Sequence, residues 1–176
     1  MDMTVFDAMD APELRAYVEF LLKNYRTMDA FWFLYVAEAF GQAEAERLNE
    51  RVWHRVGGLA ARDIIKRFPP EERGLKGFIA ALRFFPWTAL IGFDIRQSDE
   101  EVILSVPSCP TQVARLRRGL DEFDCKEMHR GEFDSFAKVI DDRIEVECFF
   151  APPDPHPEDT FCMWRFYLRD DGATLP

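Results

Sequence analysis

Apolar side chains in the first half of the chain recur at helical spacing. Over residues 14–25 they fall three and four positions apart, which places them on one stripe of a helix. Asp10 and Glu13 precede this stripe with the spacing of a capping box, so a helix is expected to begin there. Residues 29–40 are apolar on nearly every side, and Gly41 follows as a stop signal. This pattern predicts a second, separate helix of the kind found at the centre of a core.

Two more helices are expected before the pattern changes. Apolar positions mark one face of residues 43–68, and two prolines end this helix. The pair Gly57-Gly58 in its middle indicates a bend or a close crossing with another helix. A shorter helix is predicted over residues 74–85, because Pro86 stops it.

The second half contains stretches in which apolar and polar residues alternate, as they do in strands. Strands are expected at residues 93–97, 102–106, 143–150 and 161–168. Helices are predicted over residues 111–120 and 133–141. This order favours an antiparallel sheet with helices on one face. We therefore expect an α+β fold, in which a helical N-terminal half packs on an antiparallel sheet of about four strands with two further helices.

Composition indicates one folded domain. Hydrophobic residues make up 48% of the 176 residues, so the chain can bury a large core, and no low-complexity linker divides it. We expect a single compact domain with a helical subdomain over residues 1–92 and an α+β subdomain over residues 93–176. The second subdomain holds all four cysteines and most of the net charge of −10.

This acidic balance argues against two classes of partner. Nucleic acids and anionic membranes both require a concentrated basic face, which a net charge of −10 disfavours. The N-terminal residues do not resemble a signal peptide, and the longest apolar run, residues 30–37, is too short to span a membrane. Cysteines without an export signal are typical of a reducing compartment, so the sequence predicts a cytoplasmic protein.

Glu38 is the only charged residue between Asp29 and Glu44, and it shares a helix face with aromatic residues. One interpretation is a buried carboxylate with a raised pKa, which serves as an acid, a base or a ligand contact. The other is a residue near a helix end that turns to solvent or pairs with an arginine. His54 lies in a helix rich in Glu and Arg, and we expect it to be an exposed or capping side chain.

Strand alternation relates two of the four cysteines. Cys148 falls on the same face as Val146 and Phe150, and Cys162 falls on the same face as Trp164. Both faces are too apolar to meet water. Adjacent antiparallel strands would then set the two thiols opposite or diagonal to each other inside the protein.

The other two cysteines lie outside the strands. Cys109 precedes Pro110 where a strand gives way to a helix, and the free backbone N–H groups at such a junction lower the pKa of a thiol. Cys125 lies in an irregular stretch between two helices. Both would approach the strand cysteines from the side of the sheet that carries the helices.

The spacing leaves three uses open for these thiols. A metal site would combine thiolates with a histidine, and zinc suits such soft ligands, although no pair has the CxxC spacing. Its ligands would be Cys109, Cys125, Cys148, Cys162 and His156, with His129 as the other histidine. A nucleophile would be Cys109, with a histidine as its base. In the third interpretation the cysteines are small buried hydrophobic residues.

Several segments of the chain resemble a known family. These segments are Asp29-Ala-Phe-Trp-Phe-Leu, Cys109-Pro-Thr-Gln, Gly119-Leu-Asp-Glu-Phe-Asp-Cys125-Lys, Cys148-Phe-Phe-Ala-Pro-Pro-Asp-Pro-His156-Pro and Cys162-Met-Trp-Arg-Phe. They resemble an uncharacterised family of small bacterial cytosolic proteins, over most of the chain from Asp10 to Leu168. That family is distantly similar to the L-2-amino-thiazoline-4-carboxylic acid hydrolase family, and more remotely to vinyl-reductase-type small-molecule-binding domains. Similarity of this kind constrains function poorly.

The resemblance implies that the cysteines belong to one cluster. It also implies a further cysteine just before Pro-Pro-Asp, where this chain has Ala151. A site with four thiolates would therefore have to use every cysteine of this chain.

We expect a small-ligand- or metal-binding protein whose site lies between the aromatic helices and the sheet. The residues expected to line this pocket are Phe31, Trp32, Tyr35 and Trp164, with Glu38 and the thiols as its polar groups. One alternative is a thiol-dependent hydrolase that acts on a C–N bond of a small acid, with Cys109 as nucleophile. Another is an interaction module in which the aromatic helices form a homodimer. The proline-rich loop over residues 151–160 is expected to present His156 to the cysteines or to a pocket mouth, the alternative being a rigid surface connection.

Overall fold

The structure of the protein is a computed structural model that describes residues 2–169. Within this range the chain forms seven helices and four strands. It divides into two compact units, one ending at Ala45 and the other beginning at Glu46. No helix among the described residues combines the length and the apolar character needed to cross a membrane.

The first unit is dominated by one long helix. After the short helix α1 (Thr4–Asp7), α2 runs over Ala11–Phe40. The predicted capping box is confirmed, because the Glu13 backbone N–H donates to Asp10 and the Asp10 N–H donates to the Glu13 carboxylate. The prediction of two separate helices is wrong. Residues 26–28 contain no Gly or Pro to end the first helix, and α2 continues to Gly41, whose φ is +90°.

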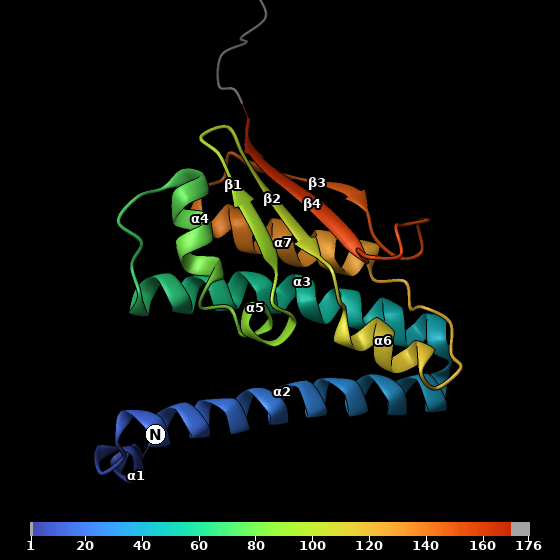
Figure 1. The fold of residues 1–176 in the computed structure, drawn as a ribbon, viewed down its shortest axis with the longest axis horizontal. Helices are drawn as coiled ribbons and strands as arrows, with labels where there is room; N and C mark the ends of the chain where they lie inside the picture. Colours follow the sequence, from blue (N-terminus) through green and yellow to red (C-terminus); the bar gives the residue numbers. More distant parts are fainter. Residues whose placement is uncertain (1, 170–176) are drawn as a thin grey trace, which may run out of the picture. The chain divides into compact units, whose positions relative to one another are not determined.

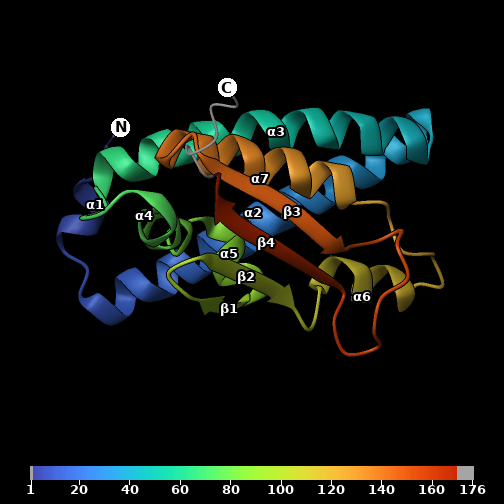
Figure 2. The ribbon, with the colours of Figure 1, turned by 90° about the horizontal axis from the view of Figure 1, so that it is seen from above.

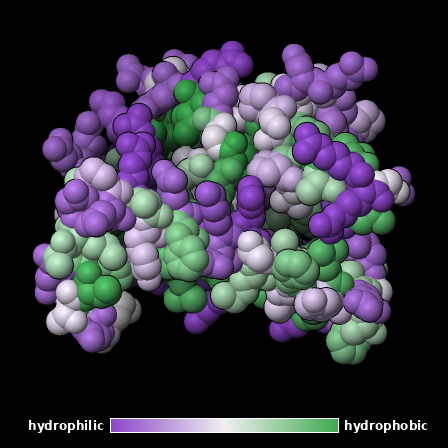
Figure 3. All heavy atoms as spheres, turned by 60° about the horizontal axis from the view of Figure 1, so that its bottom comes forward, coloured by the Kyte–Doolittle hydropathy of each residue, from purple (hydrophilic) through white to green (hydrophobic). Residues whose placement is uncertain are grey.

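No residue of α2 is buried. Large apolar side chains such as Phe31 (50% exposed) and Tyr35 (63% exposed) reach the surface. Figure 3 shows a face of the molecule on which apolar side chains lie at the surface among hydrophilic ones. Glu38 is also exposed, so the interpretation as a buried carboxylate is wrong and the interpretation as a residue that turns to solvent is correct. The physical reason is that the elements of the first unit build no core around this helix.

The second unit contains a four-stranded antiparallel sheet (Figure 2). Its strands are β1 (Asp94–Gln97), β2 (Glu101–Val106), β3 (Ile144–Phe150) and β4 (Cys162–Leu168), in the order β1-β2-β4-β3. All four strands lie within one or two residues of the predicted positions. In β2, β3 and β4 the alternating apolar residues form one buried face, whereas β1 has no buried residue. The α+β class is confirmed.

Five helices accompany the sheet. They are α3 (Gln42–Arg67, which spans the boundary between the units), α4 (Gly74–Leu82), α5 (Pro86–Ile91), α6 (Pro110–Leu116) and α7 (Lys126–Ile140). Four features differ from prediction. α4 ends at Leu82 rather than at residue 85. Pro86 starts a helix that was not predicted, as proline can at the first helical position. α6 ends at Leu116 rather than near residue 120, and α7 begins at Lys126 rather than at Phe133.

The core lies between the sheet and the helices α4 and α7, which contact it (Figure 1). Trp164 and Phe166 of β4 are fully buried and meet Phe133 of α7 in edge-to-face contacts. Gly57 confirms the predicted close crossing of helices, because a Cβ atom there would stand 2.6 Å from the backbone oxygen of Glu132 on α7. His54 is exposed, as predicted.

Asp141, at the end of α7, gives the fold a testable dependence on pH. Its buried carboxylate accepts from the Arg143 guanidinium at 3.0 and 2.9 Å and from the Arg143 backbone N–H at 3.1 Å. The guanidinium bonds lower the pKa of Asp141 to about 2 from 3.8. Since the folded pKa is the lower one, the stabilisation is present above about pH 4 and is lost as the pH falls towards 2. It amounts to about 1–2 kcal/mol, discounted because Arg143 is partly exposed.

Urea unfolding between pH 2 and 6 measures this effect. Asp141→Asn is expected to flatten the acid limb of the stability profile. The matched control is Asp142→Asn, which changes the exposed neighbour and should leave the profile as in the wild type. Identical profiles for Asp141→Asn and the wild type would contradict the assignment.

Candidate functional site

The sheet brings two cysteines to its buried face. Cys148 of β3 lies directly opposite Trp164 of β4. Cys162 is two residues from Trp164 on the same strand, so the two cysteines share a face and are diagonal neighbours, as predicted. The prediction that Phe150 shares this face is wrong. A bulge after Cys148 shifts the register by one residue and pairs Phe150 with Met163, on the other face.

Three of the four cysteines line one cavity of the second unit. Its lining residues come from five separate stretches of chain and are Ile91, Phe93, Val106, Cys109, Gln112, Cys125, His129, Phe133, Pro152, Phe161, Cys162 and Trp164. The cavity opens to solvent on one side and has a volume of about 20 Å³. This space is sufficient for about one water molecule or for the polar head of a small ligand.

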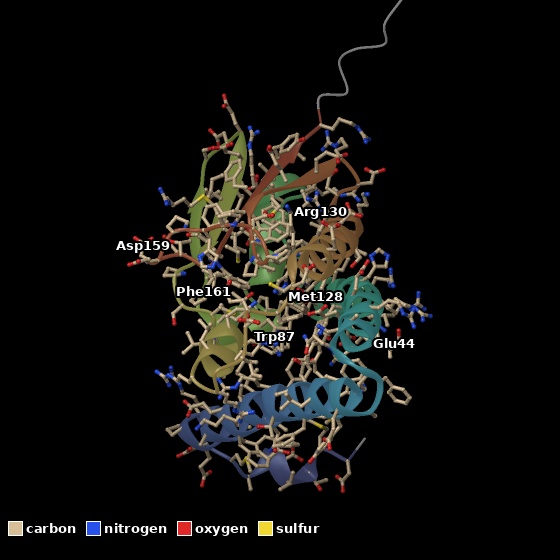
Figure 4. All side chains as sticks on the ribbon, turned by 90° about the vertical axis from the view of Figure 1, so that its right-hand side faces the viewer. Glu44, Trp87, Met128, Arg130, Asp159 and Phe161 are labelled. Carbon is tan, nitrogen blue, oxygen red and sulfur yellow. The ribbon has the colours of Figure 1, made fainter. Side chains whose placement is uncertain are left out.

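The cysteines are held at the ends of secondary-structure elements. Cys109 is the residue that precedes α6, and Cys125 is the residue that precedes α7. The Cys125 backbone N–H donates to the carbonyl of Pro152, which ties the start of α7 to the proline-rich loop. Figure 4 shows this loop, in which Asp159 projects outward, whereas Phe161 is partly buried and lines the cavity.

Gln112 fixes the loop that carries Cys125. Its side chain is 1% exposed. The amide NH₂ donates to the Phe123 carbonyl at 2.9 Å and to the Cys125 sulfur at 3.5 Å, and the amide oxygen accepts from the Phe123 N–H at 3.0 Å. A single buried side chain therefore joins α6 to the segment that precedes α7.

Burial raises the pKa of every cysteine thiol. The pKa of Cys162 rises to about 12 and that of Cys148 to about 11, with burial as the largest cause in both. The pKa of Cys125 lies well above its usual value because of burial and because of the neighbouring thiols of Cys109 and Cys162. For Cys109, hydrogen bonds from backbone N–H groups at the start of α6 favour the thiolate, but burial outweighs them and its pKa is raised too. The cavity therefore presents neutral thiols at neutral pH.

Neutral thiols should react slowly with alkylating reagents. With a pKa of about 12, Cys162 has about 1000-fold less thiolate at pH 7.5 than a thiol with its ordinary value of 9.0. The greater nucleophilicity of a more basic thiolate restores only part of this loss. We expect iodoacetamide to modify Cys162 at least about 30-fold more slowly than a cysteine in an unstructured peptide. Mass spectrometry of tryptic peptides at timed points measures this rate.

Protein unfolded in urea is the control, in which all four cysteines should react at similar rates. Rapid alkylation of Cys109 in the folded protein would contradict this account and would favour the nucleophile interpretation.

A histidine and a glutamate stand beside the thiols. His129 lines the cavity, and its Nδ1 lies 2.8 Å from Oε2 of Glu132, one turn further along α7. Glu132 is 2% exposed, and its other oxygen, Oε1, has no hydrogen-bond partner in residues 2–169. When the Glu132 carboxylate accepts from Nδ1–H, the neutral imidazole keeps Nε2 as an acceptor. The two residues were not paired by the sequence analysis, although their spacing of three positions on a helix indicates contact.

The indole of Trp164 adds an unused donor. Trp164 is fully buried and lines the cavity, and its Nε1–H has no hydrogen-bond partner among the described residues. It lies close enough to the Cys162 sulfur to favour the thiolate, yet not in the geometry of a hydrogen bond. A buried donor without a partner costs about 1–3 kcal/mol of stability.

Other predicted site residues lie elsewhere. Cys148 does not line the cavity, and neither do Trp32, Tyr35 and Glu38, which belong to α2. His156 does not line it either, but its ring packs against Phe161, which does, with ring centroids 5.3 Å apart.

His156 is engaged with Glu122 and with the backbone. Its Nδ1 hydrogen-bonds to the Pro157 carbonyl at 2.8 Å, and its Nε2 lies 3.1 Å from Glu122. These contacts raise the pKa of His156, and the hydrogen bond to the Pro157 carbonyl has the largest effect. Both ring nitrogens of His156 are therefore engaged by acceptors of the protein itself. The described residues contain no group of three or more His, Cys, Asp or Glu side chains arranged to hold a metal ion.

Comparison with known proteins places the chain in a family. The profile of a family of unknown function, DUF6125, matches residues 9–168, and the chain therefore belongs to this family. No curated protein matches the sequence.

Proposed function

We propose that this member of the DUF6125 family is a small-ligand-binding protein, and that its ligand occupies the cavity lined by Cys109, Cys125 and Cys162. The observation that carries the proposal is the make-up of the cavity. Its wall is mainly aromatic and aliphatic, and a few polar groups converge on it, which is typical of small-molecule sites. The proposed setting is the cytoplasm, where cysteines remain reduced.

Two features support binding in preference to catalysis by a thiolate. The raised pKa of Cys109 disfavours the ionised nucleophile that thiol catalysis requires. None of the residues that line the cavity is a lysine or an arginine, so the lining supplies no such cation to favour a thiolate. The resemblance to a hydrolase family adds no residue-level support to an enzyme.

A fragment screen tests the proposal by comparing the wild type with a variant whose cavity is filled. Thermal unfolding is followed with a library of uncharged fragments below about 150 Da, in reducing buffer. Cys162→Leu enlarges a side chain in the cavity wall and is expected to abolish the stabilisation by any fragment that binds there. Cys148→Leu is the matched control, because it makes the same change on the same face of the sheet but outside the cavity.

At least one fragment should stabilise the wild type and Cys148→Leu but not Cys162→Leu. Stabilisation that survives in Cys162→Leu, or a library without a single binder, would refute the proposal. Stoichiometric binding of zinc by the reduced protein would refute it in favour of the metal-binding alternative.

A further inference from the structure

We propose that helix α2 is the interface of a homodimer, in which the α2 helices of two copies pair as an antiparallel coiled coil. The interface would be a row of apolar residues, spaced alternately four and three positions apart, along the exposed side of α2. It belongs to the first unit and does not depend on a ligand in the cavity of the second.

The row of apolar residues, here called the seam, extends along nearly the whole of α2, which is one uninterrupted helix (Figure 1). Its eight members are Leu14, Val18, Leu21, Tyr25, Met28, Trp32, Tyr35 and Ala39. They follow a repeat of seven residues, and none of them is charged. Such a repeat, kept over more than three heptads, is typical of a coiled coil, because it keeps one narrow seam facing a partner helix along the full length.

The seam is exposed on the protein. Seven of its eight residues are exposed, and Tyr25 is half-buried. The exposed fractions of the larger side chains range from 36% at Trp32 to 72% at Met28. They leave roughly 700 Å² of the seam uncovered on each copy, close to the ~800 Å² that each partner buries in a standard interface. Monomeric proteins rarely leave a continuous apolar patch of this size in water.

The spacing along the seam makes α2 complementary to a reversed copy of itself. From Leu14 to Ala39 the steps are four, three, four, three, four, three and four residues, and the series is the same when read backwards. A second α2 running in the opposite direction therefore matches all eight positions at once. The resulting layers are Leu14 with Ala39, Val18 with Tyr35, Leu21 with Trp32, and Tyr25 with Met28.

Side-chain size favours this antiparallel register over a parallel one. In the antiparallel register each aromatic ring meets a smaller or flexible aliphatic side chain, as Trp32 meets Leu21. In a parallel pair every residue would meet its own copy. Two Trp32 indoles would then crowd one layer, whereas two Ala39 methyl groups would leave a gap in another. Interfaces pack as densely as protein interiors, so the alternation of large and small side chains decides for the antiparallel register.

The charges of α2 suit a second copy of the chain better than a lipid surface. The helix carries three basic and four acidic residues, a net charge of −1, so most of the net charge of −10 lies elsewhere on the chain. Two acidic proteins can therefore approach each other along this helix with little repulsion. Helices that lie on membranes are instead rich in lysine and arginine on their polar face.

Light scattering coupled to size-exclusion chromatography tests the proposal on the full chain. The wild type at micromolar concentration is expected to have twice the chain mass of 20.6 kDa. Leu21→Glu should raise the dissociation constant at least about 100-fold, because each dimer would bury two carboxylates against the Trp32 rings. Far-UV circular dichroism verifies that the variant is folded, as expected for a side chain that is 47% exposed.

Phe20→Glu is the matched control. Phe20 is the neighbouring residue on α2 and is 55% exposed, but it lies outside the seam. The same change of charge there should alter the dissociation constant by less than about threefold, because the new carboxylate stays in water. A monomeric wild type, or a dimer that persists in Leu21→Glu, would overturn the proposal.

Cysteine cross-linking tests the register independently of these variants. The double variant Val18→Cys/Tyr35→Cys should form a covalent dimer under mild oxidation, whereas Val18→Cys alone should not. Within one helix these two positions are about 25 Å apart, so the double variant cannot form the bond inside one chain. A covalent dimer of Val18→Cys alone would indicate parallel pairing, and no covalent dimer in either variant would indicate no pairing at the seam. Both results would overturn the inference, as would binding of the wild type, but not of Leu21→Glu, to phosphatidylglycerol vesicles without dimer formation.

Discussion

Trp164→Ala is expected to lower the free energy of unfolding by about 3–5 kcal/mol, the range for removing a fully buried aromatic side chain. Trp164 is 0% exposed at the centre of the sheet, where it pairs with Cys148 on one side and Leu104 on the other. Its ring also meets Phe133 edge-to-face, with centroids 5.3 Å apart. The free-energy cost has two parts, the lost burial of the indole and the cavity that it leaves, because the sheet cannot collapse to fill that cavity. Urea unfolding at neutral pH measures the change.

The control for this substitution is Phe149→Ala. Phe149 is 47% exposed on the neighbouring strand β3, so its loss is expected to cost less than about 1 kcal/mol. Trp164→Phe should cost less than Trp164→Ala, because phenylalanine keeps most of the volume and removes the unpartnered N–H. Equal effects of Trp164→Ala and Phe149→Ala would contradict the placement of Trp164 in the core.

Gln112→Ala is expected to cost about 2–4 kcal/mol, an effect out of proportion to the size of the side chain. The substitution removes the two hydrogen bonds to the backbone of Phe123 and the contact with the Cys125 sulfur, all in a buried setting. The segment between α6 and α7 should then open locally. Besides the unfolding free energy, hydrogen exchange over residues 117–125 should speed up, and Cys125 should become easier to alkylate.

Gln97→Ala is the control of the same residue type, because Gln97 is exposed on β1. It is expected to change stability by less than about 0.5 kcal/mol. Unchanged exchange over residues 117–125 in Gln112→Ala would show that other contacts hold the segment, such as the hydrogen bond from Arg115 to the Asp121 carbonyl.

Local pattern was sufficient for most of the secondary structure. The strands β3 and β4 were predicted because each buries one face, and this burial imposes the alternation visible in residues 144–148 and 162–168. The capping box at Asp10 was visible because its partners are three residues apart. The prediction of a break within α2 was wrong, because no local signal in the sequence ends the helix there. Its predicted end depended on the apolar pattern pausing, whereas only Gly, Pro or a competing cap ends a helix.

The candidate site was visible only in part. Alternation placed Cys148 and Cys162 on one face, but it could not reveal the bulge beyond Cys148, because an extra residue leaves no mark in the apolar pattern. The choice between His129 and His156 also could not be made from spacing. One histidine lies on a helix that faces the sheet and the other in a loop with its own acidic partner, Glu122.

The sequence by itself determined the α+β class, the positions of the strands along the chain and the common face of Cys148 and Cys162, since these depend on periodicities of two and 3.6 residues. Only the tertiary structure decided which cysteines meet. Cys109 and Cys125 reach Cys162 through helix starts and loops, whose paths depend on long-range contacts such as that of Gln112 with Phe123. Periodicity carries information over one or two turns of chain, whereas a cavity is assembled from segments far apart in sequence, and their meeting is determined by the packing of the whole core.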